Sequence, residues 1–179
     1  MSRFPYPDPE TLSERKRHVL TGAEGRVLNV SRMAMHAPDG LWLAQRRLGR
    51  SVVYESTIDE RLREMLILRV AYLSNSEYEL FHHLSIAENL GVTATQREAM
   101  RSGDFSTLTE QERVLATFVT EVVRDVSPSD ETLARARDLF TTEHLFEMVV
   151  LCGGYMLTAR MAALGGVEVD DTAVAGWKS

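Results

Sequence analysis

The stretch LREMLILRVAYLSNSEYELFHHLSIAENLGV, residues 62–92, decides the fold of this chain. From Met65 to Leu73 it is apolar almost all round, interrupted only by Arg69, so we expect a helix that is buried on most sides. Ser74-Asn75 then predicts a break, because a Ser followed three residues later by a Glu is a helix-capping pattern. A second helix is predicted to follow and to end at Gly91, since glycine is the usual residue just past a helix end.

The motif-bearing helix pair spans 57–91, and its first helix is expected to be capped by Thr57 with Glu60 as the partner of that cap. Capping and stop signals predict further helices on both sides of this pair. The other predicted helices cover residues 12–20, 41–54, 93–101, 109–125, 129–140 and 143–164. Residues 1–38 are predicted to form an N-terminal arm with one short helix, and residues 23–38 a loop or a short helical turn. In the last helix, the run from Met148 to Ala159 is again expected to be buried all round. No segment shows a convincing strand alternation, so we expect an all-α bundle of about seven helices in one domain, residues 1–179.

Composition excludes several classes of protein. The chain has 26 acidic and 20 basic residues, a net charge of −6, which argues against a nucleic-acid partner. Cys152 is its only cysteine, so neither an intramolecular disulfide nor a Cys-x-x-Cys redox pair can form. The apolar run in the last helix is shorter than the ~20 residues of a membrane span, and MSRFPYPDPE lacks the apolar segment of a secretory signal. We therefore expect a soluble, cytoplasmic protein with no membrane partner.

Polar residues gather where the two central helices meet. Ser76, Glu79 and His83 are spaced i, i+3 and i+7, which places them on one helical face. A carboxylate beside an imidazole is a candidate general acid/base pair. Ser76 lies in the first turn, where free backbone N–H groups favour a bound anion such as a substrate carboxylate. On spacing alone, however, such a Glu-x-x-x-His pair is more often a solvated surface pair.

The stretch 62–92 resembles the core of the carboxymuconolactone decarboxylase and alkylhydroperoxidase D family. In that family a Glu is followed, after eleven residues, by Cys-x-x-Cys-x-x-x-His. In this chain the Glu matches Glu64, the His matches His83, and the two cysteine positions are Ser76 and Glu79. Weaker likeness extends through ERVLATFVTEVV and into the last helix. The resemblance implies an alkylhydroperoxidase D-like bundle and a homo-oligomer, trimers and hexamers being usual.

The departures from the family motif predict the type of chemistry. Without the cysteine pair there is no thiolate to attack peroxide and no disulfide to form, so the resemblance does not imply a peroxidase here. It implies instead the decarboxylase branch, which uses non-redox acid–base chemistry on a small carboxylated lactone or unsaturated acid and needs no cofactor. His83 is then expected to transfer the proton, Glu79 to orient and charge His83, and Glu64 to act as a second proton relay or a structural group.

Three further residues complete the predicted site. Ser76 and Tyr78 are expected to contact the substrate, Ser76 at the helix start and Tyr78 as an aromatic wall. Arg69, on the most buried helix, is expected to pair with Glu64, Glu79 or a substrate carboxylate, because a buried charge needs a partner. His82 points about 100° away from His83 on a helix and is expected to pack or to lie at an interface.

Two other readings stay open beside the enzyme. Glu79-x-x-His82 has the spacing of carboxylate-bridged metal bundles, but His144-x-x-Glu147 has the reversed order, so only one correct motif is present and no metal is expected. The other reading is a non-catalytic oligomer that binds a ligand after losing the ancestral cysteines. The sequence names neither the substrate nor the reaction among decarboxylation, isomerisation, lactone opening and cleavage.

Overall fold

The computed structural model describes residues 2–21 and 26–174. Over these residues the chain is all-helical, which confirms the predicted fold class, although nine α-helices are present rather than about seven. The elements in chain order are a 3₁₀ turn η1 (Pro9–Thr11), α1 (Glu14–Thr21), α2 (Asn29–Ala34), α3 (Asp39–Tyr54), α4 (Glu60–Leu73), α5 (Glu77–Asn89), α6 (Ala94–Ser102), α7 (Glu110–Asp125), α8 (Asp130–Leu139) and α9 (Thr142–Gly165).

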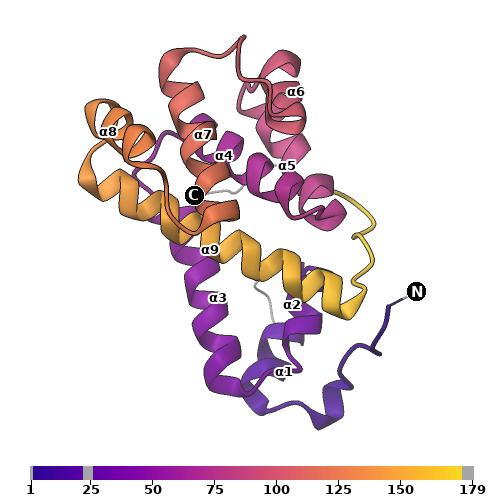
Figure 1. Cartoon of the computed structure of the whole chain (residues 1–179). Helices are drawn as coiled ribbons and strands as arrows, with labels where there is room; N and C mark the ends of the chain where they lie inside the picture. The colour runs from indigo at the N-terminus through magenta and orange to yellow at the C-terminus, as the bar shows by residue number, and fades with distance from the viewer. Residues whose placement is uncertain (1, 22–25, 175–179) are drawn as a thin grey trace.

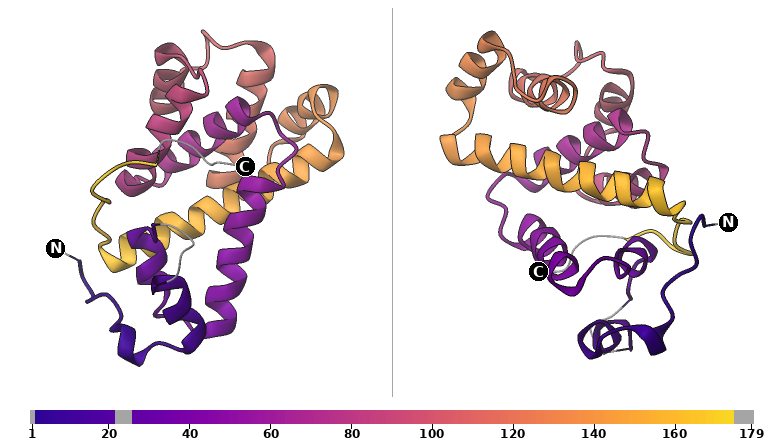
Figure 2. Two further views of the ribbon diagram at one scale, coloured as in Figure 1. Left: turned by 180° about the vertical axis from the view of Figure 1, so that it is seen from behind. Right: turned by 60° about the horizontal axis from the view of Figure 1, so that its bottom comes forward.

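Helices α4 and α9 lie at the centre of the bundle (Figure 1). Helix α4 packs against α5, α6, α7 and α9, and ten of its 14 residues are buried. Helix α9 crosses the molecule with α4–α8 on one side and α1–α3 on the other, as both views in Figure 2 show. The predicted burial of α4 is therefore confirmed, because helices cover it on most sides.

Side-chain caps begin several of the predicted helices. Thr93 and Thr109 both form reciprocal capping boxes, with Gln96 and Glu112 respectively, and the Ser129 hydroxyl accepts from the backbone of the next turn. The predicted Thr57 cap of α4 is wrong. Asp59 caps this helix by accepting from two backbone N–H groups of its first turn.

Thr57 is instead bound to α9. Its hydroxyl and its backbone N–H both donate to Glu147 Oε2, at 2.8 and 3.1 Å, and the Ser56 hydroxyl donates to the other carboxylate oxygen. These hydrogen bonds fix the start of α4 on α9, and they are the physical reason why Thr57 does not serve as a cap.

A turn of only three residues joins α4 to α5. Ser74 ends α4, Asn75 adopts a left-handed conformation with φ 51°, and Ser76 is the N-cap of α5. The break predicted at Ser74-Asn75 is therefore confirmed, and asparagine is among the few residue types other than glycine that often adopt this backbone conformation. The turn sets how α5 lies against α4.

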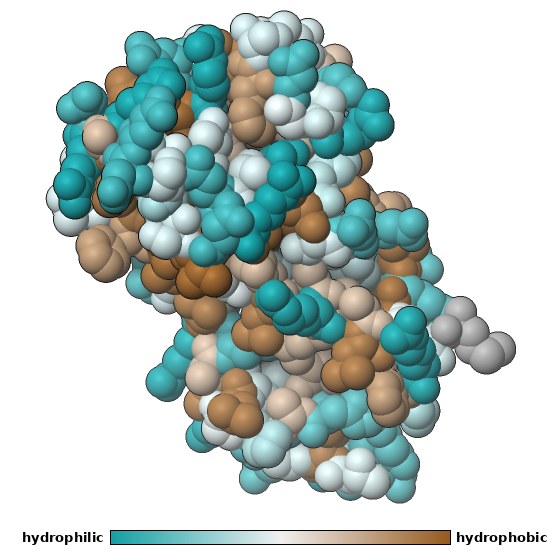
Figure 3. Space-filling model, in the orientation of Figure 1, coloured by the Kyte–Doolittle hydropathy of each residue, from teal (hydrophilic) through white to brown (hydrophobic). Residues whose placement is uncertain are grey.

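Helix α9 is less buried than its sequence predicts. Val149, Val150 and Leu157 are 44%, 48% and 40% exposed, so the expected burial of Met148–Ala159 all round is wrong. The neighbouring helices leave one face of α9 uncovered, and Figure 3 shows hydrophobic residues across the middle of the molecule, where this helix runs. Among the described residues, this helix also meets the length and composition expected of a membrane span, a criterion that core helices can meet too.

The N-terminal arm contains one more helix than the sequence predicts. Residues 23–38 were expected to be a loop or a helical turn, but Asn29–Ala34 form α2, which packs on α9. Lys16 of α1 binds the start of α3 through Asp39 and the Ala37 carbonyl, both at 2.7 Å, and lies over the Trp42 ring. The arm is thereby held against α3, where it forms one wall of the site described next.

Candidate functional site

Glu64 and His83 form a buried hydrogen-bonded pair between the two central helices. Glu64 of α4 is fully buried, His83 of α5 is buried, and Oε2 of the glutamate lies 2.7 Å from Nδ1 of the imidazole. A carboxylate at this distance holds the proton on Nδ1 and fixes the orientation of the ring. Nε2 is then the ring atom through which His83 can exchange a proton with a substrate.

Glu79 lies on the same helix, one turn before His83, and is 2% exposed. Neither of its carboxylate oxygens has a hydrogen-bond partner among the described residues. Burial raises the pKa of Glu79 to about 7, and the nearby Ser76 hydroxyl and His83 oppose this shift only in part. Close to neutral pH this carboxyl can therefore both donate and accept a proton.

These contacts differ from the predicted arrangement. Glu79 was expected to orient His83, but Glu64 does so, and the prediction for Glu79 is wrong in this respect. Glu79 and His83 share a helical face, as their spacing indicates, yet both project in the same direction from α5. A side chain from the facing helix α4 therefore reaches the imidazole where one from α5 does not.

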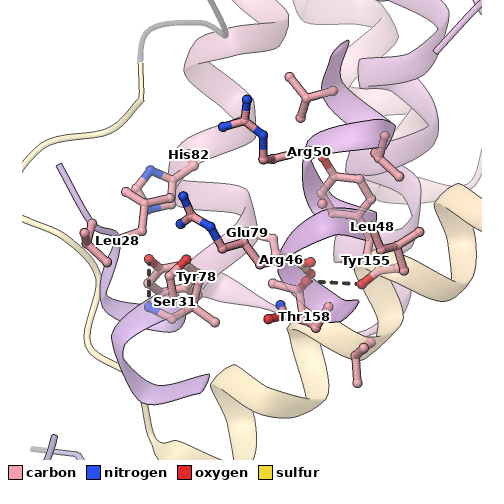
Figure 4. A pocket seen from close by; sticks show the side chains of 18 of the residues that line it. Leu28, Ser31, Arg46, Leu48, Arg50, Tyr78, Glu79, His82, Tyr155 and Thr158 are labelled. Carbon is pink, nitrogen blue, oxygen red and sulfur yellow. Dashed lines mark hydrogen bonds between the residues drawn. The ribbon is translucent and has the colours of Figure 1, made fainter. Parts of the chain in front are cut away.

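A cavity of about 370 Å³ opens beside this pair, and Glu79 and His83 both line it. Its walls come from α3, α5, α9 and residues 26–31, as the close view in Figure 4 shows. Glu64 does not line the cavity and lies behind His83. The arrangement gives an imidazole that faces the cavity on one side and is held by a carboxylate on the other.

Tyr155 of α9 packs against His83 and also lines the cavity. The two rings meet edge to face with their centroids 5.1 Å apart. Burial, together with the nearby carboxylates of Glu64 and Glu79, raises the pKa of the Tyr155 phenol. Tyr155 therefore stays neutral at physiological pH and can offer its hydroxyl as a hydrogen-bond donor.

The cavity has three arginines in its lining, two on α3 and one in the chain before α2. Arg26, Arg46 and Arg50 line it, whereas Glu79 is its only acidic residue among the described residues. Arg50 lies over the ring of Tyr54, at 5.4 Å from its centroid. Guanidinium groups beside an apolar cavity favour an organic anion.

A second polar network lies beside the cavity and is centred on Asp170. This buried carboxylate accepts hydrogen bonds from the Tyr78 hydroxyl and from the backbone N–H of Asn29, and it lies 3.1 Å from His82 Nε2 and 3.3 Å from Arg26. The network joins the C-terminal segment 167–174 to α5 and to the N-terminal wall of the cavity.

The same network fixes the state of His82. Its Nδ1 accepts from the backbone N–H of Val174, so Nε2 carries the proton that faces Asp170. Burial lowers the pKa of His82 more than Asp170 raises it, which keeps the ring neutral. The sequence predicts packing for His82, and the ring does pack, against Tyr78 and Phe81.

Two predicted substrate contacts lie elsewhere. Arg69 does not line the cavity. It donates to the Thr120 hydroxyl and the Met100 carbonyl, and it lies over the Phe105 ring. The predicted pairing of Arg69 with Glu64 or Glu79 is therefore wrong, because neutral oxygen acceptors and an aromatic face satisfy this charge.

Ser76 and Tyr78 are both used within the protein. The Ser76 hydroxyl accepts from the Glu79 backbone N–H at 3.4 Å as the cap of α5, and Ser76 does not line the cavity. The Tyr78 ring does line the cavity, in line with the predicted aromatic wall, although its hydroxyl donates to Asp170. Of the six predicted site residues, the structure thus brings Glu64, Glu79, His83 and Tyr78 together at or behind the cavity.

Neither a reactive thiol nor a metal cluster accompanies this site in the described part of the chain. Cys152 is 1% exposed, and burial raises the pKa of its thiol to about 12. No group of three or more His, Cys, Asp or Glu side chains there is arranged to hold a metal ion. Glu79 and His83 line the cavity, with Glu64 behind His83.

Sequence and fold comparisons place these features among known proteins. Residues 43–121 match the carboxymuconolactone decarboxylase family, which confirms the resemblance seen in the sequence. No curated protein matches the chain.

Three solved structures share the fold. A peroxidase-related protein with an alkylhydroperoxidase AhpD core from Ralstonia eutropha is 19% identical, with a TM-score of 0.78 over 95% of this chain and 93% of that one. A peroxidase-related protein from Silicibacter is 16% identical, with a TM-score of 0.75 over 94% and 91%. A protein of unknown function from Agrobacterium tumefaciens, suggested to be the antioxidant defence protein AhpD, is 20% identical, with a TM-score of 0.68 over 76% and 94%. At these identities the likeness establishes the fold.

Proposed function

We propose that this chain, whose residues 43–121 belong to the carboxymuconolactone decarboxylase family, is an enzyme that acts on a small organic acid. It uses acid–base rather than redox chemistry. The observation that carries the proposal is the pair of proton-transfer groups at the cavity. His83 is held by a fully buried glutamate, and Glu79 is buried beside it with a pKa of about 7. Buried titratable groups that face a cavity are typical of catalytic sites.

The reaction that we propose is a decarboxylation or a related lyase or isomerase step. In a decarboxylation the bond between the carboxylate carbon and the adjacent carbon breaks, CO₂ leaves, and the electron pair moves into a conjugated carbonyl of the substrate. A proton must then be delivered to the resulting dienolate carbon. His83 supplies or removes this proton through Nε2, while Glu64 stabilises the charged imidazolium that forms when the ring takes up a proton.

Glu79 serves as the second proton carrier in this proposal. In its neutral form it can donate a hydrogen bond to an enolate oxygen, and it can give its proton to His83 after the imidazolium has protonated the substrate carbon. The Glu79 carboxylate left by that transfer then takes up a proton from water. Peroxide reduction by a thiol is disfavoured because Cys152, the only cysteine, is buried and has a raised pKa. We expect this activity in the cytoplasm.

The test is turnover of carboxylated lactones and β,γ-unsaturated acids in D₂O, followed by NMR for loss of CO₂ or for deuterium incorporation. His83→Gln should reduce the rate by about 100-fold or more, the range typical of a lost general acid–base group, while the circular dichroism spectrum stays unchanged. His144→Gln is the matched control, since His144 lies on α9 and does not line the cavity. Full activity of His83→Gln on a true substrate would refute the proposal, as would dithiol-dependent peroxide reduction that Cys152→Ser abolishes.

We also propose that a second copy of the chain covers the exposed apolar face of α9. Phe146, Val150, Leu157 and Leu164 share this face at helical spacing and are 72%, 48%, 40% and 65% exposed. Contiguous exposed apolar faces of this kind mark interaction surfaces, and closed symmetric oligomers are the usual way in which a single chain covers them. Val150→Glu should lower the mass measured by sedimentation, and a wild-type monomer at micromolar concentration would contradict the proposal.

A further inference from the structure

The walls of the cavity are more apolar than a small polar acid requires. Ten of the 24 residues that line it carry aliphatic, thioether or indole side chains, among them Leu28, Trp42, Val52 and Leu157. Trp42 is 3% exposed and Val52 8%, so these side chains are part of the folded core as well as of the wall. A ligand that fills this cavity therefore has to place hydrocarbon against the wall, because buried polar groups without partners are costly.

The apolar wall comes largely from outside the family-matched residues 43–121. Seven of the ten apolar lining residues lie before or after that range, on α1, α2 and its C-cap residue, the chain between α1 and α2, the start of α3 and α9. In contrast, Glu79 and His83 lie within it. The part of the chain that carries the chemistry is thus distinct from the part that shapes most of the apolar surface.

The cations of the cavity are placed at one side of this apolar wall. Arg46 and Arg50 lie one turn apart on α3, and both line the cavity. In Figure 4 the Arg46 side chain extends toward His82 and Glu79 of α5, and Arg50 lies beside it, one turn along α3. The third cation, Arg26, is bound to Asp170 and to Thr172 of the C-terminal segment. Arg46 and Arg50 lie on one helix at the cavity, so both guanidinium groups can meet the same anionic head group.

We propose that the cavity binds an amphiphilic organic acid, whose carboxylate is bound by Arg46 and Arg50 and whose hydrocarbon body lies against the apolar wall. This inference rests on the proposed function and narrows its substrate to acids with an extended apolar body. The body then runs past Glu79 and His83, so that a carbon atom next to the head group comes within reach of the two proton-transfer groups. Binding of this kind uses the Arg pair for orientation and the apolar wall for affinity.

Isothermal titration calorimetry with simple carboxylates tests the inference without a known substrate. Octanoate should bind the full chain more tightly than butanoate, by up to about fourfold for each added methylene until the cavity is filled. Octanoate binding should also show a negative heat-capacity change, the marker of buried apolar surface. Octanol and octylamine should bind at least tenfold more weakly than octanoate, because only the carboxylate matches the guanidinium groups. Equal affinity for butanoate and octanoate, or for octanoate and octylamine, would overturn the inference.

Variants on α3 test the role of the arginines. Arg46→Gln combined with Arg50→Gln should weaken octanoate binding by about tenfold or more. Arg47→Gln is the matched control, since Arg47 is exposed on the same helix and does not line the cavity, and it should leave the affinity unchanged. An unchanged affinity in the double variant, or an equal loss in the control, would overturn the assignment.

The two proposals fail in different ways. If the wild type turns over short polar acids in a reaction that requires His83, yet does not bind octanoate, the amphiphilic substrate class is wrong and the acid–base function stands. If octanoate binds as expected and His83→Gln leaves turnover of every bound acid unchanged, the binding site stands and the proposed function is wrong.

Discussion

Replacement of Glu79 by glutamine should make the protein more stable at high pH and should change how its stability depends on pH. The wild-type carboxyl is 2% exposed, and neither of its oxygens has a partner among the described residues, so its charged form is poorly solvated. Glutamine has nearly the same shape and does not titrate. The variant therefore removes the cost of charging this position and retains most of the packing.

The size of the effect follows from the raised pKa. Burial moves the pKa of Glu79 from its ordinary value of 4.5 to about 7. Between these two values the folded protein keeps a proton that the unfolded chain has released, so the free energy of unfolding falls as the pH rises, by about 1.4 kcal/mol for each pH unit. The full cost is reached above pH 7 and is about 3 kcal/mol.

Urea unfolding followed by circular dichroism, at intervals between pH 5 and pH 8.5, measures this cost. The difference in unfolding free energy between Glu79→Gln and the wild type should shift in favour of the variant by about 2 to 3 kcal/mol over this range. Glu77→Gln, on the exposed side of the same helical turn, is the matched control. Its curve should run parallel to that of the wild type above pH 6. If the curve of Glu79→Gln is parallel as well, the reasoning about this buried carboxyl is refuted.

Three further experiments, one of labelling and two of substitution, examine the surroundings of the site. Because Cys152 is buried and its thiol has a pKa of about 12, DTNB at pH 8 should label it at least about 100-fold more slowly in the native protein than in urea, and equal rates would contradict its burial. Asp170→Asn should lower the unfolding free energy by about 3 kcal/mol and speed hydrogen exchange in the C-terminal segment. The reason is that it removes the charge of a buried carboxylate that takes part in several hydrogen bonds. Unchanged exchange there would show that the segment is held by other contacts. Gly103→Ala should lower the unfolding free energy by about 1 kcal/mol more than Gly91→Ala does. Both glycines have φ near 80°, but only at position 103 would the new Cβ meet a side chain, the Arg69 guanidinium at 3.2 Å. Equal melting temperatures would exclude that clash.

Local signals in the sequence predict most of the fold. The turn between α4 and α5, the helices that begin after Thr93 and Thr109, and the burial of α4 are all confirmed, because each depends on residues within a few positions of one another. The exposed face of α9 could not be predicted in the same way. A helix that is apolar all round gives no sign of which side its neighbours cover, so Val150 and Leu157 could only be placed by the packing of other helices.

The candidate site could be predicted only in part. The resemblance to a family pointed to Glu64 and His83, although 19 positions separate them in the chain. It did not reveal which glutamate holds the imidazole, because that depends on how α4 crosses α5. Asp170 lies 88 positions after His82 and carries no local motif, so nothing in the spacing of the sequence could have associated the two.

The sequence did not predict Arg46 and Arg50 as residues of the site, for a different reason. Arginines on an amphipathic helix usually face solvent, and nothing in their own spacing separates them from Arg47, which does not line the cavity. Only the packing of α3 in the folded chain places two of these three side chains at the cavity.

The three-residue turn between α4 and α5 has an evolutionary consequence. One extra residue there would rotate α5 by about 100° about its own axis and carry His83 away from Glu64. The loop 126–129 lies at the surface and holds no residue that lines the cavity, so changes in its length do not alter the site. We therefore expect insertions and deletions among relatives of this protein to be frequent between α7 and α8 and to be rejected by natural selection between Leu73 and Glu77.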